Sequence, residues 1–167
     1  MNDEACVELL CGVPCSGKTT YAKRWMNAQE GRGWVLLSCD EALFKLEDVL
    51  CDDYDAALER VKAYLLDQSV SLVRAGCGVL LDWGFWQRAE RERVSAFYAQ
   101  AGIACRWHYI DVSPEEWMRR CEKRNAAVRA GEEEACFVDE GLRKKVLSRF
   151  EKPERDEIDA WVESGRA

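Results

Sequence analysis

The sequence predicts a three-layer α/β fold, in which a parallel β-sheet carries helices on both faces. Four short apolar segments, too short for helices and mostly rich in Val and Leu, are separated by longer segments with helical spacing. Strands that alternate with helices are joined by right-handed crossovers, which place the helices over both faces of a parallel sheet. Ligands of such folds bind outside the carboxyl ends of the strands, so we expect a functional site there.

The expected strands are the segments 6–12, 34–39, 78–83 and 103–112. The first three are short apolar runs, which is typical of strands that helices cover on both faces. The fourth contains polar residues. We therefore expect the fourth strand to lie nearer an edge of the sheet.

The expected helices cover the segments 17–30, 54–76, 87–102, 113–131 and 139–150. Ser113 is a favourable N-cap and Pro114 suits the first helical position. Glycines at the ends of three segments are typical of helix termination, and Pro153 stops the last helix. No repeat or low-complexity linker interrupts this order, so we expect residues 1–167 to form a single domain.

Composition limits the class of function. The 167 residues carry a net charge of −7, which disfavours a nucleic-acid partner because such proteins normally present a basic face. No apolar run approaches the ~18 residues of a membrane span, and the acidic N-terminus lacks the features of a signal peptide, so we expect a cytoplasmic protein without a membrane partner. The nine cysteines include no Cys-x-x-Cys, and with one histidine in the chain a zinc site has little support.

Residues 12–19 match the pattern G-x-x-x-x-G-K-[ST] at every fixed position, and we call them the phosphate loop. An apolar strand precedes the loop and an amphipathic helix follows it, as the motif requires. Glycines let backbone N–H groups turn inward as a nest for phosphate oxygens at the positive end of a helix. The residues expected to bind ATP are Gly12, Pro14, Cys15, Ser16, Gly17, Lys18, Thr19 and Thr20.

Lys18 is expected to contact the β- and γ-phosphates, and the Thr19 hydroxyl to bind Mg²⁺. Asp82 directly follows the apolar run 79–81, so its carboxylate is expected at the same edge of the sheet, as a ligand of the metal or of its water shell. The alternative for Asp82 is a turn-forming residue before Gly84.

Asp40 follows the second expected strand and should lie at the same edge. A carboxylate near the γ-phosphate that the metal does not need can accept the proton of an acceptor hydroxyl. Asp40 is also a suitable N-cap for a helix beginning at Glu41. The two roles are compatible.

Arg120 and Arg124 are four residues apart and share one face of the expected helix. A polar, glycine-containing stretch follows them, so residues 119–138 are expected to act as a lid that brings guanidinium groups over the phosphates. Both arginines are therefore candidate catalytic residues, ahead of Arg119. The alternative is a solvated, salt-bridged face formed with Glu115, Glu116, Glu122 and Lys123.

Three further groups allow two interpretations each. Trp83, Phe85 and Trp86 could line an acceptor pocket or pack as core. Arg88 and Arg91 could bind an anionic group or solvate a helix. For His108, inside the fourth expected strand, a core position is favoured over catalysis.

The segments "GVPCSGKTTYAKR", "VLLDWGFWQRAERER", "YIDVSPEEWMRRCEKRN" and "FEKPERDE", together with Asp40, resemble small P-loop kinases of the AAA_33 (zeta-toxin-like) type. This group includes the polynucleotide 5′-hydroxyl kinase domain and chloramphenicol phosphotransferase. The resemblance covers nearly the whole chain. It implies a P-loop NTPase fold with four to five strands in the order 2-3-1-4, and here the segment 158–164 is at best a rudimentary fifth strand.

The resemblance implies ATP and Mg²⁺ as cofactors, Asp40 as the group that activates the acceptor, and Arg120 or Arg124 as the lid arginine. Polynucleotide kinases typically carry Asp-x-x-Arg after the second strand, whereas this chain has Leu43 in the arginine position. We therefore expect phosphoryl transfer from ATP to a hydroxyl of an unidentified small molecule. The alternatives are a polynucleotide 5′-hydroxyl kinase and a non-catalytic ATP-binding regulator, and the oligomeric state is left open.

Overall fold

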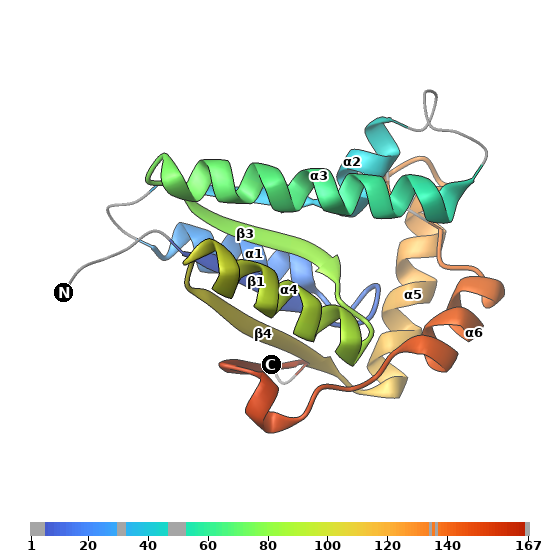
Figure 1. Cartoon of the computed structure of the whole chain (residues 1–167). Coiled ribbons are helices and arrows are strands. Elements are labelled where there is room, and N and C mark those ends of the chain that lie inside the picture. The colour runs from blue at the N-terminus through green and yellow to red at the C-terminus, as the bar shows by residue number, and fades with distance from the viewer. Residues whose placement is uncertain (1–5, 30–32, 47–52, 134, 136, 166–167) are drawn as a thin grey trace.

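The structure, a computed structural model, describes residues 6–29, 33–46, 53–133, 135 and 137–165 and contains one five-stranded sheet (Figure 1). The strands are β1 (Val7–Cys11), β2 (Trp34–Ser38), β3 (Gly78–Gly84), β4 (Cys105–Val112) and β5 (Ala160–Ser164). The helices are α1 (Lys18–Asn27), α2 (Cys39–Lys45), α3 (Tyr54–Arg74), α4 (Arg88–Ala101), α5 (Pro114–Arg129), α6 (Glu140–Arg149) and the short 3₁₀ helix η2 (Arg155–Glu157).

The sheet order is β2-β3-β1-β4-β5 and every pairing is parallel, which confirms the predicted three-layer α/β fold. The central strand β1 pairs with β3 from Val7 opposite Val79 and with β4 from Val7 opposite Cys105. All residues of β1 and β3 are buried, since both faces of the sheet are covered.

The fifth strand corrects two expectations from the sequence. β5 pairs with β4 over five positions, from His108 opposite Ala160 to Val112 opposite Ser164, so it is a regular strand and β4 is not at the edge. Its hydrophobic anchor is Trp161, whose ring lies 4.7 Å from that of Tyr109 on β4. The polar residues around Trp161 are those of an edge strand, which is covered less completely than the strands inside the sheet.

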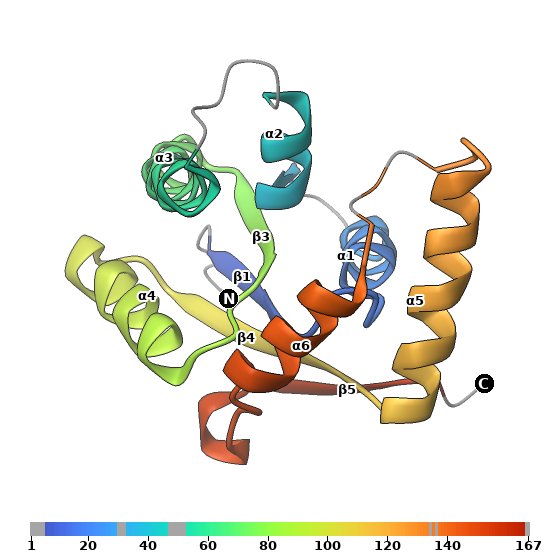
Figure 2. The ribbon, with the colours of Figure 1, turned by 90° about the vertical axis from the view of Figure 1, so that its right-hand side faces the viewer.

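The helices form two layers (Figure 2). α3 and α4 cover one face of the sheet, and the main core lies between them and side chains such as Leu9, Leu81 and Trp107. α1 covers the other face over Leu10 and Leu80. No helix among the described residues is both long and apolar enough to span a membrane.

A second, smaller core lies at the carboxyl end of the sheet, where α5 and α6 pack together (Figure 1). Its buried members are Trp117, Cys121, Val138 and Val146. Val13 and Cys15 of the phosphate loop pack against this cluster. The small core therefore joins the loop after β1 to the helices after β4.

Helix α2 begins at Cys39, two residues earlier than the Glu41 that the sequence suggested. The Ser38 hydroxyl accepts a hydrogen bond from the Glu41 amide at 3.2 Å, so Ser38 is the N-cap and Asp40 lies in the first helical turn. The expectation that Asp40 caps this helix was wrong, because Ser38 offers an equally good cap at the strand end. The expected N-cap Ser113 is confirmed, with Pro114 at the start of α5.

Arg91 is a structural residue rather than an anion-binding one. Its side chain is buried, and its Nε donates to Glu157 Oε2 at 2.9 Å. Its Nη1 donates to the carbonyls of Phe85 (3.2 Å) and Glu151 (3.1 Å). Arg91 therefore fastens α4 to the segment that leads into β5, whereas Arg88 is exposed and forms a surface pair with Glu92.

A buried polar network lies between β1, β4 and α1. Glu8 on β1 is fully buried and accepts a hydrogen bond from Arg106 Nε at 2.9 Å. Its other oxygen lies 2.6 Å from His108 Nε2, and the second ring nitrogen lies 2.7 Å from the Tyr21 hydroxyl. The histidine is therefore satisfied in the core, as the sequence favoured.

We predict that Glu8→Ala lowers the free energy of unfolding by about 3 kcal/mol, because it leaves buried partners unpaired and opens a cavity. Urea unfolding of the two proteins measures the difference. The matched control is Glu92→Ala, which removes an exposed pair and should change stability by less than about 1 kcal/mol. Equal losses in the two variants would contradict a supporting role for the network.

Candidate functional site

The phosphate loop leaves the end of β1 and turns back into α1. The Gly12 amide donates to the Gly84 carbonyl at 2.9 Å, which ties the start of the loop to the end of β3. A Cβ on Gly12 would lie 3.0 Å from Ser16 Oγ and 3.1 Å from the Ile110 carbonyl oxygen, and Gly17 has φ +100°. Both positions therefore require glycine, and the loop delivers the free amides at the N-terminus of α1 to the sheet edge.

Lys18 folds back over the loop. Its Nζ donates to the Gly12 carbonyl at 3.2 Å and to the Val13 carbonyl at 2.9 Å. The ammonium group thus lies directly beside the loop backbone and adds positive charge to the positive end of α1. An anion bound to the loop amides would meet this cation.

Ser16 carries a buried side-chain hydroxyl with no hydrogen-bond partner in the described part of the chain. A buried hydroxyl without a partner costs about 1–3 kcal/mol, so it is kept where a bound group can satisfy it. The orphaned hydroxyl and the amides at the N-terminus of α1, which directly follows the loop, fit a polyphosphate.

Thr19 and Asp82 meet at the start of α1. The Thr19 hydroxyl donates to Asp82 Oδ2 at 2.7 Å, although the residues are far apart in the sequence. Asp82 lies inside β3 and is nearly fully buried, so it is not the turn residue of the alternative interpretation.

The Thr19–Asp82 pair fits Mg²⁺. The described residues hold no group of three His, Cys, Asp or Glu side chains that could bind a metal ion. A single hydroxyl and a single carboxylate suit Mg²⁺, which usually takes one or two protein oxygens and completes its shell with phosphates and water.

Asp40 lies in the first turn of α2, just beyond Ser38, which pairs with Asp82 across β2 and β3. Its side chain is open to solvent at the sheet edge, yet the surrounding protein excludes enough water to raise the pKa of the carboxyl, and the charge of Asp82 raises it further. The cations Lys18, Arg124 and Lys62 oppose this shift. Asp40 is thus electrostatically coupled to Lys18, Asp82 and Arg124.

Arg120 of α5 binds the backbone of the phosphate loop. Its Nη1 donates to the Ser16 carbonyl at 2.7 Å and to Ser164 Oγ at 2.8 Å, and its Nε donates to Glu116 at 2.6 Å. These contacts hold the loop backbone between α5 and β5. The expected catalytic role of Arg120 stays a prediction.

Arg124 lies one turn further along α5 and reaches the front of the loop. Its Nη1 donates to Cys15 Sγ at 3.5 Å, and its Nε lies 3.5 Å from Glu133. Burial alone would lower the pKa of this guanidinium, but the charges of Cys15, Glu133 and Asp40 outweigh burial and raise it. Arg124 is therefore the better placed of the two arginines for contact with a phosphate.

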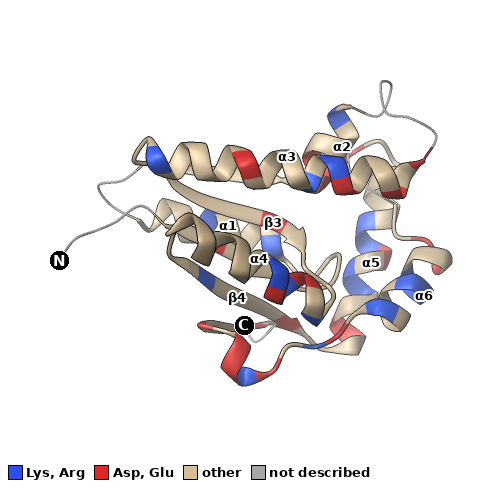
Figure 3. Ribbon diagram, viewed as in Figure 1, with Lys and Arg blue, Asp and Glu red and all other residues tan. Residues whose placement is uncertain are grey.

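Positive charge is concentrated near this edge despite the net charge of −7. Figure 3 shows Lys and Arg along α5 and α6, at the end of the molecule that holds the carboxyl ends of the strands. These residues are Arg119, Arg120, Lys123, Arg124, Arg129, Arg143, Lys144, Lys145 and Arg149.

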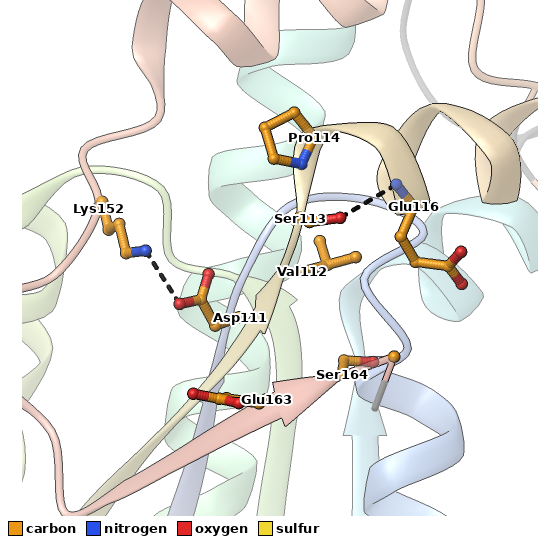
Figure 4. Close-up of a pocket in the computed structure, with 9 residues that line it drawn as sticks. Asp111, Val112, Ser113, Pro114, Glu116, Lys152, Glu163 and Ser164 are labelled. Atoms are coloured by element: carbon orange, nitrogen blue, oxygen red, sulfur yellow. Dashed lines mark hydrogen bonds and ion pairs between the residues drawn. The ribbon is translucent and has the colours of Figure 1, made fainter. Parts of the chain in front are cut away.

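A pocket of about 480 Å³ lies between the carboxyl ends of β4 and β5 and the start of α5 (Figure 4). Asp111 and Lys152 form one wall and are joined by an ion pair of 2.9 Å, while Glu116 and Ser164 lie on the side of the phosphate loop. The Ser164 hydroxyl donates to the Ser16 carbonyl at 2.9 Å. Sequence reasoning missed this pocket because one side of it is built by Glu163 and Ser164 of β5.

The aromatic residues after Asp82 do not line this pocket. Trp83 and Phe85 are buried in the main core, with their rings 4.5 Å apart. Trp86 packs against the small core. These positions favour the core interpretation of the aromatic run.

Comparison with known proteins agrees with this geometry. The model of the AAA_33 family, described as an AAA domain, matches residues 7–153. No curated protein matches the sequence significantly. The fold is similar to the APS kinase CysC of Mycobacterium tuberculosis, solved with AMPPNP and APS, at a TM-score of 0.69 and 21% identity over 98% of this chain and 91% of that one.

Two further solved structures share the fold. One is Kti12 of Chaetomium thermophilum in complex with ADP-AlF3, at a TM-score of 0.72 and 17% identity over 93% of this chain and 87% of that one. The other is a chain of the Pnkp1/Rnl/Hen1 RNA repair complex, at a TM-score of 0.65 and 21% identity over 89% of this chain and 45% of that one.

The family match spans most of the chain, a strand and a helix flank the phosphate loop as expected, and the solved structures share the fold. The protein therefore belongs to the AAA_33 family and has the fold of a P-loop kinase.

Proposed function

We propose that this protein is a kinase that transfers the γ-phosphate of ATP to a hydroxyl group of a small-molecule acceptor. One observation carries the proposal: Ser38 at the end of β2 pairs with Asp82 on β3, so Asp40 in the first turn of α2 brings a second carboxylate to the edge that holds Thr19 and Asp82. A loop that only binds nucleotide would not require this second carboxylate.

The residues on the two sides of the phosphate loop indicate how a bound nucleotide would be oriented. Asp40 and Asp82 lie at the ends of the β2 and β3 side of the sheet, whereas the pocket lies at β4 and β5. A triphosphate on the loop amides would therefore extend its γ-phosphate toward Asp40 and its nucleoside toward the pocket. The buried Ser16 hydroxyl and Lys18 would contact the phosphates between them.

Thr19 and Asp82 would hold Mg²⁺, which when bound would neutralise charge on the β- and γ-phosphates. Lys18 and Arg124 would add positive charge from the protein. Of the two arginines expected in the lid, 119–138, we favour Arg124, because Arg120 is already engaged with the loop backbone. Lid movement would carry Arg124 over the phosphates.

In the transfer step, Asp40 accepts the proton of the acceptor hydroxyl. The acceptor oxygen forms a bond to the γ-phosphorus while the bond from that phosphorus to the β–γ bridging oxygen breaks, and ADP leaves. The raised pKa makes the Asp40 carboxylate a stronger base than that of an ordinary aspartate. The carboxyl also stays protonated up to a higher pH than an ordinary aspartate does.

Two observations favour a small acceptor over a polynucleotide. Leu43 occupies the position where polynucleotide kinases carry arginine, and the chain is acidic. The basic residues of α6 favour the polynucleotide alternative, but Lys144 and Lys145 are already paired with acidic side chains. A panel of nucleosides, sugars, hydroxylated antibiotics and 5′-hydroxyl oligonucleotides, followed by mass spectrometry, identifies the acceptor by the gain of one phosphoryl group.

We predict that Asp40→Asn lowers phosphoryl transfer by about 10²- to 10⁴-fold, because the acceptor loses its base. ATP affinity should stay nearly unchanged. The matched control is Glu41→Gln, which alters the neighbouring exposed carboxylate and should leave turnover intact. Turnover of Asp40→Asn at the rate of the unmodified protein would remove Asp40 from the role of base.

We predict that Lys18→Ala weakens ATP binding by about 10- to 100-fold, since a charge-assisted contact to phosphate is lost. Lys23→Ala on the exposed side of α1 is the control. The contrary outcome is tight ATP binding by the unmodified protein, without a phosphorylated acceptor and without ADP above the Lys18→Ala background. That result would favour the ATP-binding regulator over the kinase.

A further inference from the structure

The phosphate loop contains a cysteine in an unusual backbone conformation. Cys15 has φ +61°, in the left-handed region that costs a residue with a Cβ about 1–2 kcal/mol. Its side chain is half-buried and packs against the small core between the loop and α5. The thiol therefore points toward α5, while the amide remains part of the loop.

A second thiol meets Cys15 there. Cys121 on α5 is fully buried in the small core against which Cys15 packs, and Cys15 lies near enough to contribute to the raised pKa of Cys121. Arg124, one turn further along α5, donates to Cys15 Sγ at 3.5 Å. Cys15 thus has a thiol on one side and a guanidinium on the other.

The contact between the loop and α5 is fixed on both sides of this pair. Trp117 Nε1 donates to the Pro14 carbonyl at 2.7 Å, and Arg120 Nη1 donates to the Ser16 carbonyl at 2.7 Å. The residues of the loop before and after Cys15 are therefore both held by α5. Such anchoring keeps the two sulfurs together in the folded protein.

We propose that Cys15 and Cys121 form an oxidation site, at which a peroxide converts the two thiols into a disulfide that ties the phosphate loop to α5. Cys15 is partly accessible and lies beside a guanidinium, as an attacking cysteine does. Cys121 is the buried second thiol, in the position of a resolving cysteine.

The order of events follows from the surroundings of each sulfur. Burial, together with the nearby Cys15, raises the pKa of Cys121 to about 12, so Cys121 stays a thiol. Cys15 is the accessible sulfur and has a cation beside it, so its thiolate attacks the peroxide. One peroxide oxygen goes to Cys15 to form a sulfenic acid, and the other leaves as hydroxide.

In the second step, the Cys121 sulfur loses its proton and attacks the sulfur of the sulfenic acid. The S–S bond forms, the S–O bond breaks, and water leaves. The two thiols lose two electrons in total, and one hydrogen peroxide is reduced to two waters.

The consequence for nucleotide binding rests on the proposed function. A disulfide holds its sulfurs about 2.05 Å apart, much closer than two sulfurs that are not bonded to each other. Closing that gap pulls Cys15 toward α5 and moves its amide out of the loop nest, which is built of backbone groups. We therefore expect the oxidised protein to bind ATP at least about tenfold more weakly.

The test treats the reduced, full-length protein with hydrogen peroxide under native conditions and digests it with trypsin after alkylation of free thiols. The expected product is the peptide 1–18 linked to the peptide 121–123. The first peptide contains Cys6, Cys11 and Cys15, and fragmentation shows which sulfur carries the link. The same digest of urea-unfolded protein should show no preference for this pair.

The variants are Cys121→Ala and, as a matched control, Cys77→Ser, which changes a half-buried thiol before the start of β3. Cys121→Ala should not form the linked peptide and should keep its ATP affinity after peroxide. Cys77→Ser should behave as the unmodified protein. If thermal unfolding shows that Cys121→Ala is unstable, Cys121→Ser gives the same comparison.

The outcomes separate this proposal from the proposed function. Absence of the 1–18/121–123 link, or a link through Cys6 or Cys11, overturns the oxidation site. A link that leaves ATP affinity unchanged, or a loss that dithiothreitol does not reverse, overturns its effect on the loop. Reduced protein that binds no ATP contradicts the proposed function, while the peptide link still decides whether the cysteines react as a pair.

Discussion

The structure depends on one constraint: the backbone between β1 and α1 must turn sharply and still present amides to an anion. One hydrogen bond closes the turn itself, from the Ser16 amide to the Val13 carbonyl at 3.2 Å, and neighbouring elements hold other carbonyls of the loop. Trp117 and Arg120 of α5 bind the carbonyls of Pro14 and Ser16, and Ser164 of β5 binds the latter as well. Gly84 of β3 fixes the start of the turn. The arrangement of the carboxyl end of the sheet is in this sense a scaffold for one loop.

The charged residues fall into two groups, those that hold secondary-structure elements together and those at the phosphate loop. Charges that fasten elements are buried and fully paired, as with Glu8 between strands and Arg91 before β5. Charges at the front of the loop have less complete partners in the described part of the chain: Lys18 donates to carbonyls, and Arg124 contacts a thiol and lies 3.5 Å from a carboxylate oxygen of Glu133. A site that receives a highly charged ligand keeps its own charges incompletely neutralised, so that binding completes them.

Much of the fold followed from the sequence, because the first three strands are short apolar runs, the long helices have helical spacing, and the loop motif occurs between a strand and a helix. β5 could not be predicted with the same ease. Its stability comes from Trp161 against Tyr109 and from pairing with β4, and neither contact has a local signature. The residues gathered at the sheet edge followed from strand order, as with Asp82 beside Thr19. By contrast, the different positions of Arg120 and Arg124 depend on the rotation of α5 against the loop, which spacing along a helix does not reveal.

The bond from Ser164 to the Ser16 carbonyl joins residues 148 positions apart in the chain. Contacts of such long range form late in folding, since the entropy of closing a long loop has to be overcome first. The phosphate loop thus acquires its final support only when β5 has joined the sheet. During synthesis, Ser164 leaves the ribosome long after Ser16, so the loop is made well before the residue that completes its support. Capture of an anion by the loop would then favour the completed sheet over its unfinished forms.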